Sequence, residues 1–538
     1  MAFVGIVLLA IFLRFWQLGN IPPSPDWDEA ALGYNAYSIL KTGRDEYGTF
    51  LPRVLRSYDD YKPPLYAYLT IPSVAAFGLN VWAVRLPSAV MGSIAVIGTY
   101  FLALYLFKKK RMALLSALLL AISPWHLQFS RIAFEANVGL TLNIVGCVAF
   151  FYGLTSLPWL SVSAFLFGLA LYAYHSERVF VPLLVLTLAI LWRRELFRDY
   201  RKVAIGVIIG LLTVAPLIPV ATDKAMLTRL QGTSSLSDTT GLLMRTVKKL
   251  EEDKMHGDTI GALFDNRRLV YAATLMDGYI SHYSFRWLFL TGDNDRHHAP
   301  DNGLLYLWEL PFLLWGIFSI WKKGGKVSQL LFTWFLIAPI AASPTSETPH
   351  AIRTLVFLPT FQIFTATGLL AFVSRVREGI SQNNALRKWF TIGIAGSVGM
   401  VIVFNTLFYF HMYYSHLNQE DSRFWQYGYA QAVKYAEAHK AKYKKIVVSI
   451  KLEQPHMFFL FYTKYDPATY LAQGGTASGG FREIRNHFDK YDFRAIGEWS
   501  KEIHDGSVLY IGTPKEIPSG AQHSIYYLNG EEAIRIAE

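Results

Sequence analysis

Long apolar runs recur along the first three quarters of this 538-residue chain, and they constrain its fold more than any other feature. Most hold about 17–25 residues, the length at which a helix crosses a hydrocarbon core. Hydrophobic residues make up 52% of the chain and charged residues only 17%, which is unusual for a soluble protein of this size. The pattern predicts a polytopic α-helical membrane protein. Eleven candidate transmembrane helices can be read from it, at 1–19, 81–107, 112–129, 137–154, 159–174, 179–192, 203–221, 303–321, 328–342, 352–374 and 389–411.

The first run lacks a basic leader and a small-residue cleavage site, so we expect a retained helix rather than a signal peptide. The apolar stretch 64–78 is too short to span and is interpreted as a partial or re-entrant helix. After about residue 412 the composition becomes that of a soluble protein. We therefore divide the chain into a membrane domain, 1–412, and a soluble domain, 413–538.

Basic residues are concentrated in alternate connections between the predicted transmembrane helices. The short connections 108–111, 193–202, 322–326 and 375–388 are all basic, which predicts that they face the cytoplasm. The N-terminus then lies on the cytoplasmic side of a plasma membrane. The loops 20–80 and 222–302, together with the soluble domain, lie on the extracytoplasmic side. This topology accounts for much of the net charge of +11, so no nucleic-acid partner is expected.

The predicted outer segments hold nearly all the polar residues that interrupt apolar sequence, which suggests one cavity at the outer surface. The first is "SPDWDEAALGYNAYSIL", 24–40. Its prolines end the first span, and Ser24 or Asp26 can cap a new helix. Asp28 and Glu29 point in different directions on that helix. One interpretation is a favourable contact of acids with a helix N-terminus. The other is a general base that takes a proton from an acceptor.

Lys62 lies in the second outer cluster, "DDYKPPLY", where two prolines fix its direction. It can bind a phosphate as a point charge or extend to lipid headgroups. Two arginine–histidine groups allow the same two interpretations, and arginine adds a bidentate fork for phosphate. The candidates for phosphate binding are Lys62, Arg178, His350 and Arg353; those for the substrate or acceptor loop include Asp59, Asp60, Tyr61 and His175.

Glu135 lies four residues after Arg131, so it forms either a salt bridge with it or a second catalytic carboxylate. The stretch "GDNDRHH", 292–298, is dense in polar residues but lacks the spacing of a known metal motif. A divalent cation is possible there, and we favour hydrogen bonding to a sugar or an acceptor, with no metal cofactor. The residues concerned are Asp293, Asn294, Arg296 and His297.

No nucleotide-binding, nucleophile-elbow or zinc-protease motif is present in the sequence. A sugar donor carried on a membrane lipid would suit a site at the membrane surface.

These motifs together resemble the GT-C fold glycosyltransferases. More narrowly, they resemble the protein O-mannosyltransferases, the aminoarabinose lipid A transferases and their bacterial relatives. It rests on the Asp-Glu pair, on "YKPPLY" and "VRLPSAVMG", and on the segments 279–311 and 346–359, and it covers about residues 1–410. The resemblance implies a polyprenyl-phosphate-linked sugar donor and a reaction on the outer face. It implies that Asp28 serves at the catalytic centre and that Lys62 contacts the lipid phosphate. Glu135 stands where the family often has Asp.

The soluble domain combines a helical stretch, 425–441, with strand-like runs at 445–450, 457–463 and 507–512. It is expected to be a small α/β module, and a role in acceptor recognition is an inference from its position only.

We therefore expect an inverting glycosyl transfer to a protein, glycolipid or polysaccharide acceptor, with Asp28, Glu29 and Glu135 as the catalytic candidates. A transporter or lipid flippase would share the spans and buried charges, but it would typically show internal repeats, which this sequence lacks. A non-catalytic sensor would leave the Asp-Glu and Lys-Pro-Pro motifs unexplained.

Overall fold

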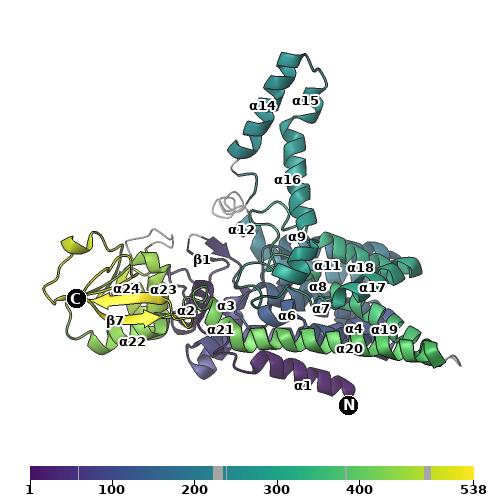
Figure 1. Ribbon diagram of the computed structural model, residues 1–538, viewed down its shortest axis with the longest axis horizontal. Helices are drawn as coiled ribbons and strands as arrows, with labels where there is room; N and C mark the ends of the chain where they lie inside the picture. Colours follow the sequence, from purple (N-terminus) through teal and green to yellow (C-terminus); the bar gives the residue numbers. More distant parts are fainter. Residues whose placement is uncertain (59, 222–233, 238, 382–384, 478–485) are drawn as a thin grey trace.

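The computed structural model describes residues 1–58, 60–221, 234–237, 239–381, 385–477 and 486–538. A helical bundle occupies one end of the molecule and the C-terminal domain the other, with a helical hairpin projecting sideways between them (Figure 1). Each of the eleven predicted runs overlaps a bundle helix. These are α1 (Ala2–Phe15), α4 (Val81–Phe107), α5 (Lys110–Ile122), α7 (Ala136–Gly153), α8 (Leu157–Ala170), α9 (Glu177–Leu191), α11 (Tyr200–Val214), α17 (Glu309–Lys323), α18 (Gly325–Ile337), α19 (Thr360–Ile380) and α20 (Ala385–His411).

Among the described residues, five helical segments are long and apolar enough to cross a membrane: Val81–Phe107, Ala136–Gly153, Arg193–Val220, Leu355–Ile380 and Ala385–Asp421. The helical character of the predicted membrane domain is thus confirmed, whereas the number eleven stays a prediction. Short helices complete the bundle: α6 (Pro124–Phe129), α10 (Arg193–Leu196), η1 (Phe197–Asp199), η2 (Ala215–Leu217), α12 (Ile218–Ala221), η3 (Trp287–Thr291) and η4 (Leu355–Phe357).

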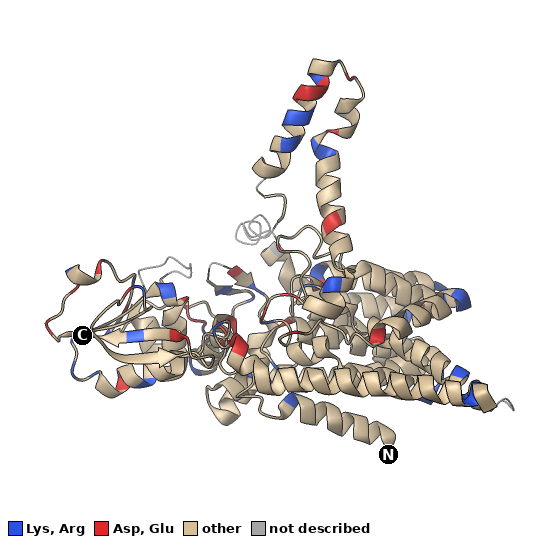
Figure 2. Cartoon of the chain, in the orientation of Figure 1, with Lys and Arg blue, Asp and Glu red and all other residues tan. Residues whose placement is uncertain are grey.

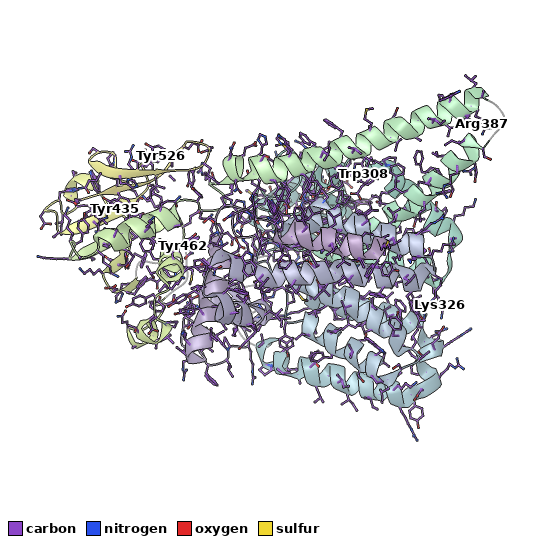
Figure 3. All side chains as sticks on the ribbon, turned by 90° about the horizontal axis from the view of Figure 1, so that it is seen from below. Trp308, Lys326, Arg387, Tyr435, Tyr462 and Tyr526 are labelled. Atoms are coloured by element: carbon purple, nitrogen blue, oxygen red, sulfur yellow. The ribbon has the colours of Figure 1, made fainter. Side chains whose placement is uncertain are left out.

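Lysines and arginines gather at the end of the bundle that is farthest from the C-terminal domain (Figure 2). Lys326 and Arg387 lie at this end, whereas Tyr435 and Tyr526 lie on the C-terminal domain (Figure 3). The described residues of the basic connections predicted to be cytoplasmic therefore share one end of the molecule. Which side of a membrane this end faces stays a prediction.

Glycine allows two of the bundle helices to approach closely. A Cβ added to Gly316 in α17 would lie 1.8 Å from the carbonyl oxygen of Phe364 in α19. A Cβ added to Gly368 in α19 would lie 2.0 Å from the carbonyl oxygen of Phe312. Small residues at such crossings bring two backbones into contact, which is a common way of packing helices inside a membrane.

The first outer segment folds between the bundle and the C-terminal domain. It contains helix α2 (Trp27–Thr42), the antiparallel strands β1 (Leu55–Ser57) and β2 (Asp60–Lys62), and the short helix α3 (Leu65–Phe77). Asp26 caps α2, and its side chain accepts a hydrogen bond from the backbone of Glu29 while the Glu29 side chain accepts one from the backbone of Asp26. This reciprocal capping box confirms the predicted helix and selects Asp26 as its cap.

The projecting hairpin comes from the second outer segment. Its helices are α14 (Thr240–His256), α15 (Gly261–Phe264) and α16 (Arg267–Ser281). The chain then returns to the bundle through the loop 292–308, which lies near the start of α2.

The C-terminal domain follows the π-helical turn η5 (Met412–His416) and α21 (Leu417–Asp421), which continue the direction of α20. Its sheet has the strand order β4-β5-β3-β6-β8-β7, with β3 parallel to both of its neighbours. The strands are β3 (Lys445–Val448), β4 (His487–Phe488), β5 (Tyr491–Phe493), β6 (Val508–Gly512), β7 (Ala521–Tyr526) and β8 (Glu532–Ala537); the helices are α22 (Tyr429–His439), η6 (Ile450–Leu452), α23 (Pro455–Thr463), α24 (Pro467–Ala472) and η7 (Trp499–Lys501).

The structure corrects one predicted strand, because residues 457–463 belong to helix α23. Every residue from Pro455 to Phe461 is buried, so the run is apolar on all faces and gives no periodic signal that would separate a buried helix from a buried strand. The helical and strand predictions at 425–441, 445–450 and 507–512 are confirmed as to type. The boundary drawn at residue 412 stays a prediction.

Candidate active site

The turn that leads into α2 presents three acidic side chains in different directions. Asp26 and Glu29 are fully buried and form the capping box, while Asp28 is partly exposed. The Asp28 carboxylate pairs with the ammonium group of Lys62. Lys62 ends β2, opposite Leu55 of β1, and the two following prolines stiffen the chain beyond it. The strand pairing and the prolines together aim this lysine at the start of α2.

Several carboxylates keep Lys62 charged. Burial opposes the charged form of this lysine, but Asp28, Glu135 and Asp60 outweigh it and raise the pKa of Lys62 above its ordinary value. Glu135, at the start of α7, is itself buried, and it contributes to the field around Lys62 from a distant part of the chain. The two predicted acids Asp28 and Glu135 therefore act on the same cation.

His175 and Arg178 lie beside the strand that carries Lys62. The His175 Nε2 atom lies 3.0 Å from the carbonyl oxygen of Tyr61, and its Nδ1 atom lies 3.4 Å from the Arg178 guanidinium. A carbonyl only accepts and a guanidinium only donates, so His175 carries its proton on Nε2. The tertiary structure thus gathers Tyr61, Lys62, His175 and Arg178 from two distant segments.

Glu29 faces the buried side of the turn that leads into α2, where its carboxylate accepts several hydrogen bonds. Its carboxylate accepts two hydrogen bonds from Arg85, at 2.8 and 2.7 Å, and one from the backbone of Ala133 at 2.8 Å. Arg85 also donates to the carbonyl oxygens of residues 18, 22 and 24. Sequence reasoning missed Arg85 as a site residue, although a charge inside the apolar run "VWAVRLPSAV" signals a buried partner.

Arg296 joins the loop 292–308 to the start of α2. Its Nη1 atom lies 3.2 Å from the Asp26 carboxylate, and its guanidinium stacks 4.4 Å above the Trp27 ring. Gln128 donates to the carbonyl oxygen of Arg296 at 2.7 Å, and Asn294 accepts from its backbone N–H at 3.1 Å. Burial, together with repulsion from Asp28, raises the pKa of Asp26 to about 7. This loop therefore supports the start of α2.

A second polar cluster lies beyond Arg296. The Asp293 carboxylate accepts hydrogen bonds from His297 Nδ1 at 2.8 Å and from the backbone of Ala351 at 2.6 Å. His350 Nδ1 lies 3.8 Å from the same carboxylate oxygen. Burial alone would raise the pKa of Asp293, but the hydrogen bond and charge of His297 lower it to about 2. His297 also packs against the ring of Phe134, the residue before Glu135.

Arg353 lies three residues after His350, but its side chain turns back to its own loop. There it donates to Thr345 Oγ1 at 2.7 Å and to the carbonyl oxygen of Ser346 at 2.5 Å.

The remaining predicted residues lie elsewhere. Asp60 accepts a hydrogen bond from the backbone N–H of Tyr61 at 3.0 Å. Asp59 lies outside the described residues. Arg131 donates to the carbonyl oxygens of Leu13 in α1 and Ile21 in the following turn, and to the Tyr413 hydroxyl, rather than forming the helical i,i+4 arrangement with Glu135 considered from the sequence.

A cavity of about 940 Å³ opens between this surface and the C-terminal domain. Trp27, Asn294 and Arg296 line it on the side of the membrane domain. The C-terminal side contributes aromatic, basic and acidic side chains, among them Tyr427, Tyr429, Lys451, Glu453, Lys515 and Tyr527. The domain contacts α2 and the turn before it: the Tyr34 hydroxyl donates to the carbonyl oxygen of Tyr465 at 3.1 Å, and Ser24 Oγ lies 3.2 Å from the hydroxyl of Tyr462, which Figure 3 labels.

Comparisons with known proteins extend these observations. Residues 61–219 match the family described as dolichyl-phosphate-mannose-protein mannosyltransferase. A search of curated proteins finds no match. Among solved structures, ArnT from Cupriavidus metallidurans bound to undecaprenyl phosphate is similar with a TM-score of 0.54 and 12% identity, over 99% of this chain and 97% of that one.

The apo form of the same ArnT matches with a TM-score of 0.52, at the same identity and coverage. The oligosaccharyltransferase AglB from Archaeoglobus fulgidus, in complex with an inhibitory peptide and a dolichol-phosphate, matches with a TM-score of 0.50 and 11% identity, over 96% of this chain and 69% of that one. The fold resemblance therefore includes the C-terminal domain, and the predicted resemblance to this group of transferases is confirmed in the overall fold and in the family match of residues 61–219.

Proposed function

We propose that this protein is a membrane glycosyltransferase that moves a sugar from a polyprenyl-phosphate donor to an acceptor, with inversion at the anomeric carbon. The observation that carries the proposal is the Asp28–Lys62 pair, which joins a partly exposed carboxylate to a buried cation at the outer end of an apolar bundle. The family match covers Lys62 and Glu135, and a solved relative of the same fold binds undecaprenyl phosphate. The transporter alternative has no comparable support.

Asp28 is assigned as the general base. It takes the proton of the acceptor hydroxyl or amine while the acceptor's oxygen or nitrogen forms a bond to the anomeric carbon. The bond between that carbon and the phosphate oxygen breaks, and its electron pair leaves with the lipid phosphate. Attack and departure occur on opposite faces of the sugar, so the configuration inverts. Glu135 is assigned to orienting the acceptor or the donor near Lys62.

Lys62 is assigned to the donor phosphate, whose charge grows as the sugar departs. In the free protein the Asp28 carboxylate forms an ion pair with the ammonium group of Lys62. A donor phosphate competes with this carboxylate for the N–H groups of Lys62, and as it binds it weakens the hold of the lysine on Asp28, which can then accept a proton. Donor binding would therefore activate the base. Arg178 and His175 lie beside Tyr61 and supply further donors in the same region.

Arg353 and His350 are the remaining candidates for the phosphate, and their own contacts are with Thr345 and with Asp293 rather than with Lys62. Glu29 is assigned a positioning role, since both of its oxygens are engaged with Arg85 and the backbone. The cavity between the two domains suits an acceptor, because it opens beside Trp27 and is lined by both parts of the chain. The reaction on the extracytoplasmic face is part of the same proposal.

The decisive test separates chemistry from donor binding. Asp28→Asn should lower the rate of sugar transfer by about 10²–10⁴, because a general base contributes that much. The same variant should bind undecaprenyl phosphate as tightly as the wild type or more tightly, because the competing carboxylate charge is gone. Lys62→Ala should lose the thermal stabilisation that this lipid gives to the wild type.

Asp277→Asn is the matched control, since Asp277 is an exposed carboxylate on α16, a helix of the projecting hairpin. It should change neither measurement. If Asp28→Asn transferred sugar at the wild-type rate, the assignment of Asp28 as the base would be overturned. If Lys62→Ala bound undecaprenyl phosphate as the wild type does, this lysine would be removed from the donor site.

A further inference from the structure

We propose that Asp293, His297 and His350 form a binding site for a divalent transition metal of the zinc type. One ligand atom from each residue lies within 4.8 Å of the other two. The first two residues belong to the loop 292–308, and the third belongs to the turn after α18. The site goes beyond the proposed transfer reaction, and its evidence does not depend on that reaction.

The distances fit a small metal ion after slight movement. Asp293 Oδ2 lies 2.8 Å from His297 Nδ1 and 3.8 Å from His350 Nδ1. Bonds of about 2.0–2.2 Å in a tetrahedral zinc site place ligand atoms about 3.3–3.6 Å apart. One contact must therefore lengthen and the other shorten by about half an ångström each, which side-chain rotation can supply.

An unsatisfied atom supports the site. The Nδ1 atom of His350 is buried and makes no hydrogen bond among the described residues. A buried polar atom without a partner is costly, and a metal ion would give this nitrogen a ligand bond. His298, the other histidine of the loop, is already engaged, because its two nitrogens lie 2.7 and 3.1 Å from backbone carbonyl oxygens.

The surroundings hold the candidate ligands in place. The backbone N–H of Ala351 donates to Asp293 Oδ2 at 2.6 Å. The backbone N–H of His350 donates to His282 Nε2 at 3.1 Å, and His282 Nδ1 is in turn bonded to the carbonyl oxygen of Gly278. Such outer contacts orient ligands and are typical of metal sites.

The donor set favours zinc over magnesium or calcium. Two imidazole nitrogens and one carboxylate are suited to zinc and similar transition metals, whereas magnesium and calcium prefer oxygen ligands. Three protein ligands leave a fourth position for water. The bound ion would tie the loop 292–308 to the turn at His350 and so steady Arg296, which contacts Asp26 and Trp27.

The test measures metal content in the full-length protein in detergent. Chelator-treated wild-type protein is incubated with zinc chloride and freed of unbound metal. Its zinc content is then measured by inductively coupled plasma mass spectrometry. We expect stoichiometric zinc and a higher unfolding temperature. Magnesium chloride should produce neither effect. His350→Ala and Asp293→Asn should lose the bound zinc and the stabilisation.

His256→Ala is the matched control, because His256 ends the exposed helix α14; it should retain zinc like the wild type. Circular dichroism and an unchanged elution volume in size-exclusion chromatography verify that each variant is folded. Failure of the wild type to bind zinc at micromolar concentration would overturn the proposal whatever the variants do. Retention of zinc by both ligand variants would also overturn it.

Discussion

The ion pairs Glu29–Arg85 and Asp28–Lys62 begin at neighbouring residues of α2 but have different environments. The side chains of Glu29 and Arg85 are 1% and 0% exposed, and those of Asp28 and Lys62 are 28% and 11% exposed. The first pair is fixed by further hydrogen bonds on both partners. The second is open to exchange with a charged ligand. A buried pair of this kind positions a helix, whereas a partly exposed pair can take part in binding.

The largest expected effect follows from breaking the buried pair. Arg85→Met should lower the free energy of unfolding by about 3–5 kcal/mol, because it leaves the Glu29 carboxylate buried without its cation. Thermal or denaturant unfolding in detergent would measure the loss. Lys62→Met is the comparison variant, and we expect it to weaken phosphate binding while changing stability much less. Equal destabilisation by the two variants would contradict the distinction between the pairs.

A third acid, Glu46, sharpens the comparison because its side-chain hydrogen bonds come from neutral groups. It is 1% exposed and accepts from Asn35 at 2.9 Å and from Thr476 at 2.6 Å. Burial raises the pKa of Glu46 from 4.5 to about 7. The folded protein therefore holds this proton more tightly than the unfolded chain.

The stability associated with that proton is fully present below about pH 4.5 and is lost as the pH rises through about 7. The expected loss is at most about 3 kcal/mol. Glu46→Gln should flatten this part of the stability curve, measured as unfolding temperature against pH. A wild-type slope that persists in the variant would assign the pH dependence to other groups.

A smaller effect is expected at the contact that brings the two domains together over α2. A Cβ added to Gly33 would lie 2.6 Å from a methyl carbon of Val84 and 2.8 Å from the ring of Phe461. Gly33→Ala should therefore destabilise the protein by about 1–3 kcal/mol through overpacking. Gly241→Ala, where the space is open, serves as the control. The two unfolding temperatures should differ clearly, and similar values would show that the contact yields easily.

The smallest effect should come from an exposed ion pair. Arg375 and Glu378 lie 3.5 Å apart, with side chains 74% and 64% exposed. Arg375→Ala should change the free energy of unfolding by less than about 1 kcal/mol, because solvent screens such pairs. A loss comparable with that of Arg85→Met would mean that exposure does not separate these pairs.

The sequence alone determined the features that depend on local order. Apolar length predicted the bundle helices, and the proline–aspartate stretch predicted the start of α2. The stiff "KPPLY" segment identified Lys62, and the acidic pair at the start of the first outer helix identified Asp28. The structure places these two side chains against each other. These signals are local, because helix length, capping and proline restraint act over a few residues.

Only the tertiary structure decided which residues meet. It paired Glu29 with Arg85, 56 residues away, and separated the roles of two adjacent acids. It brought His350 to Asp293 and His297, so a loop without metal-motif spacing gained a third candidate ligand. It also made a helix of residues 457–463, where burial on every side removes the periodicity that would reveal it. Contacts between distant segments depend on how whole helices pack, and no spacing along the chain records that packing.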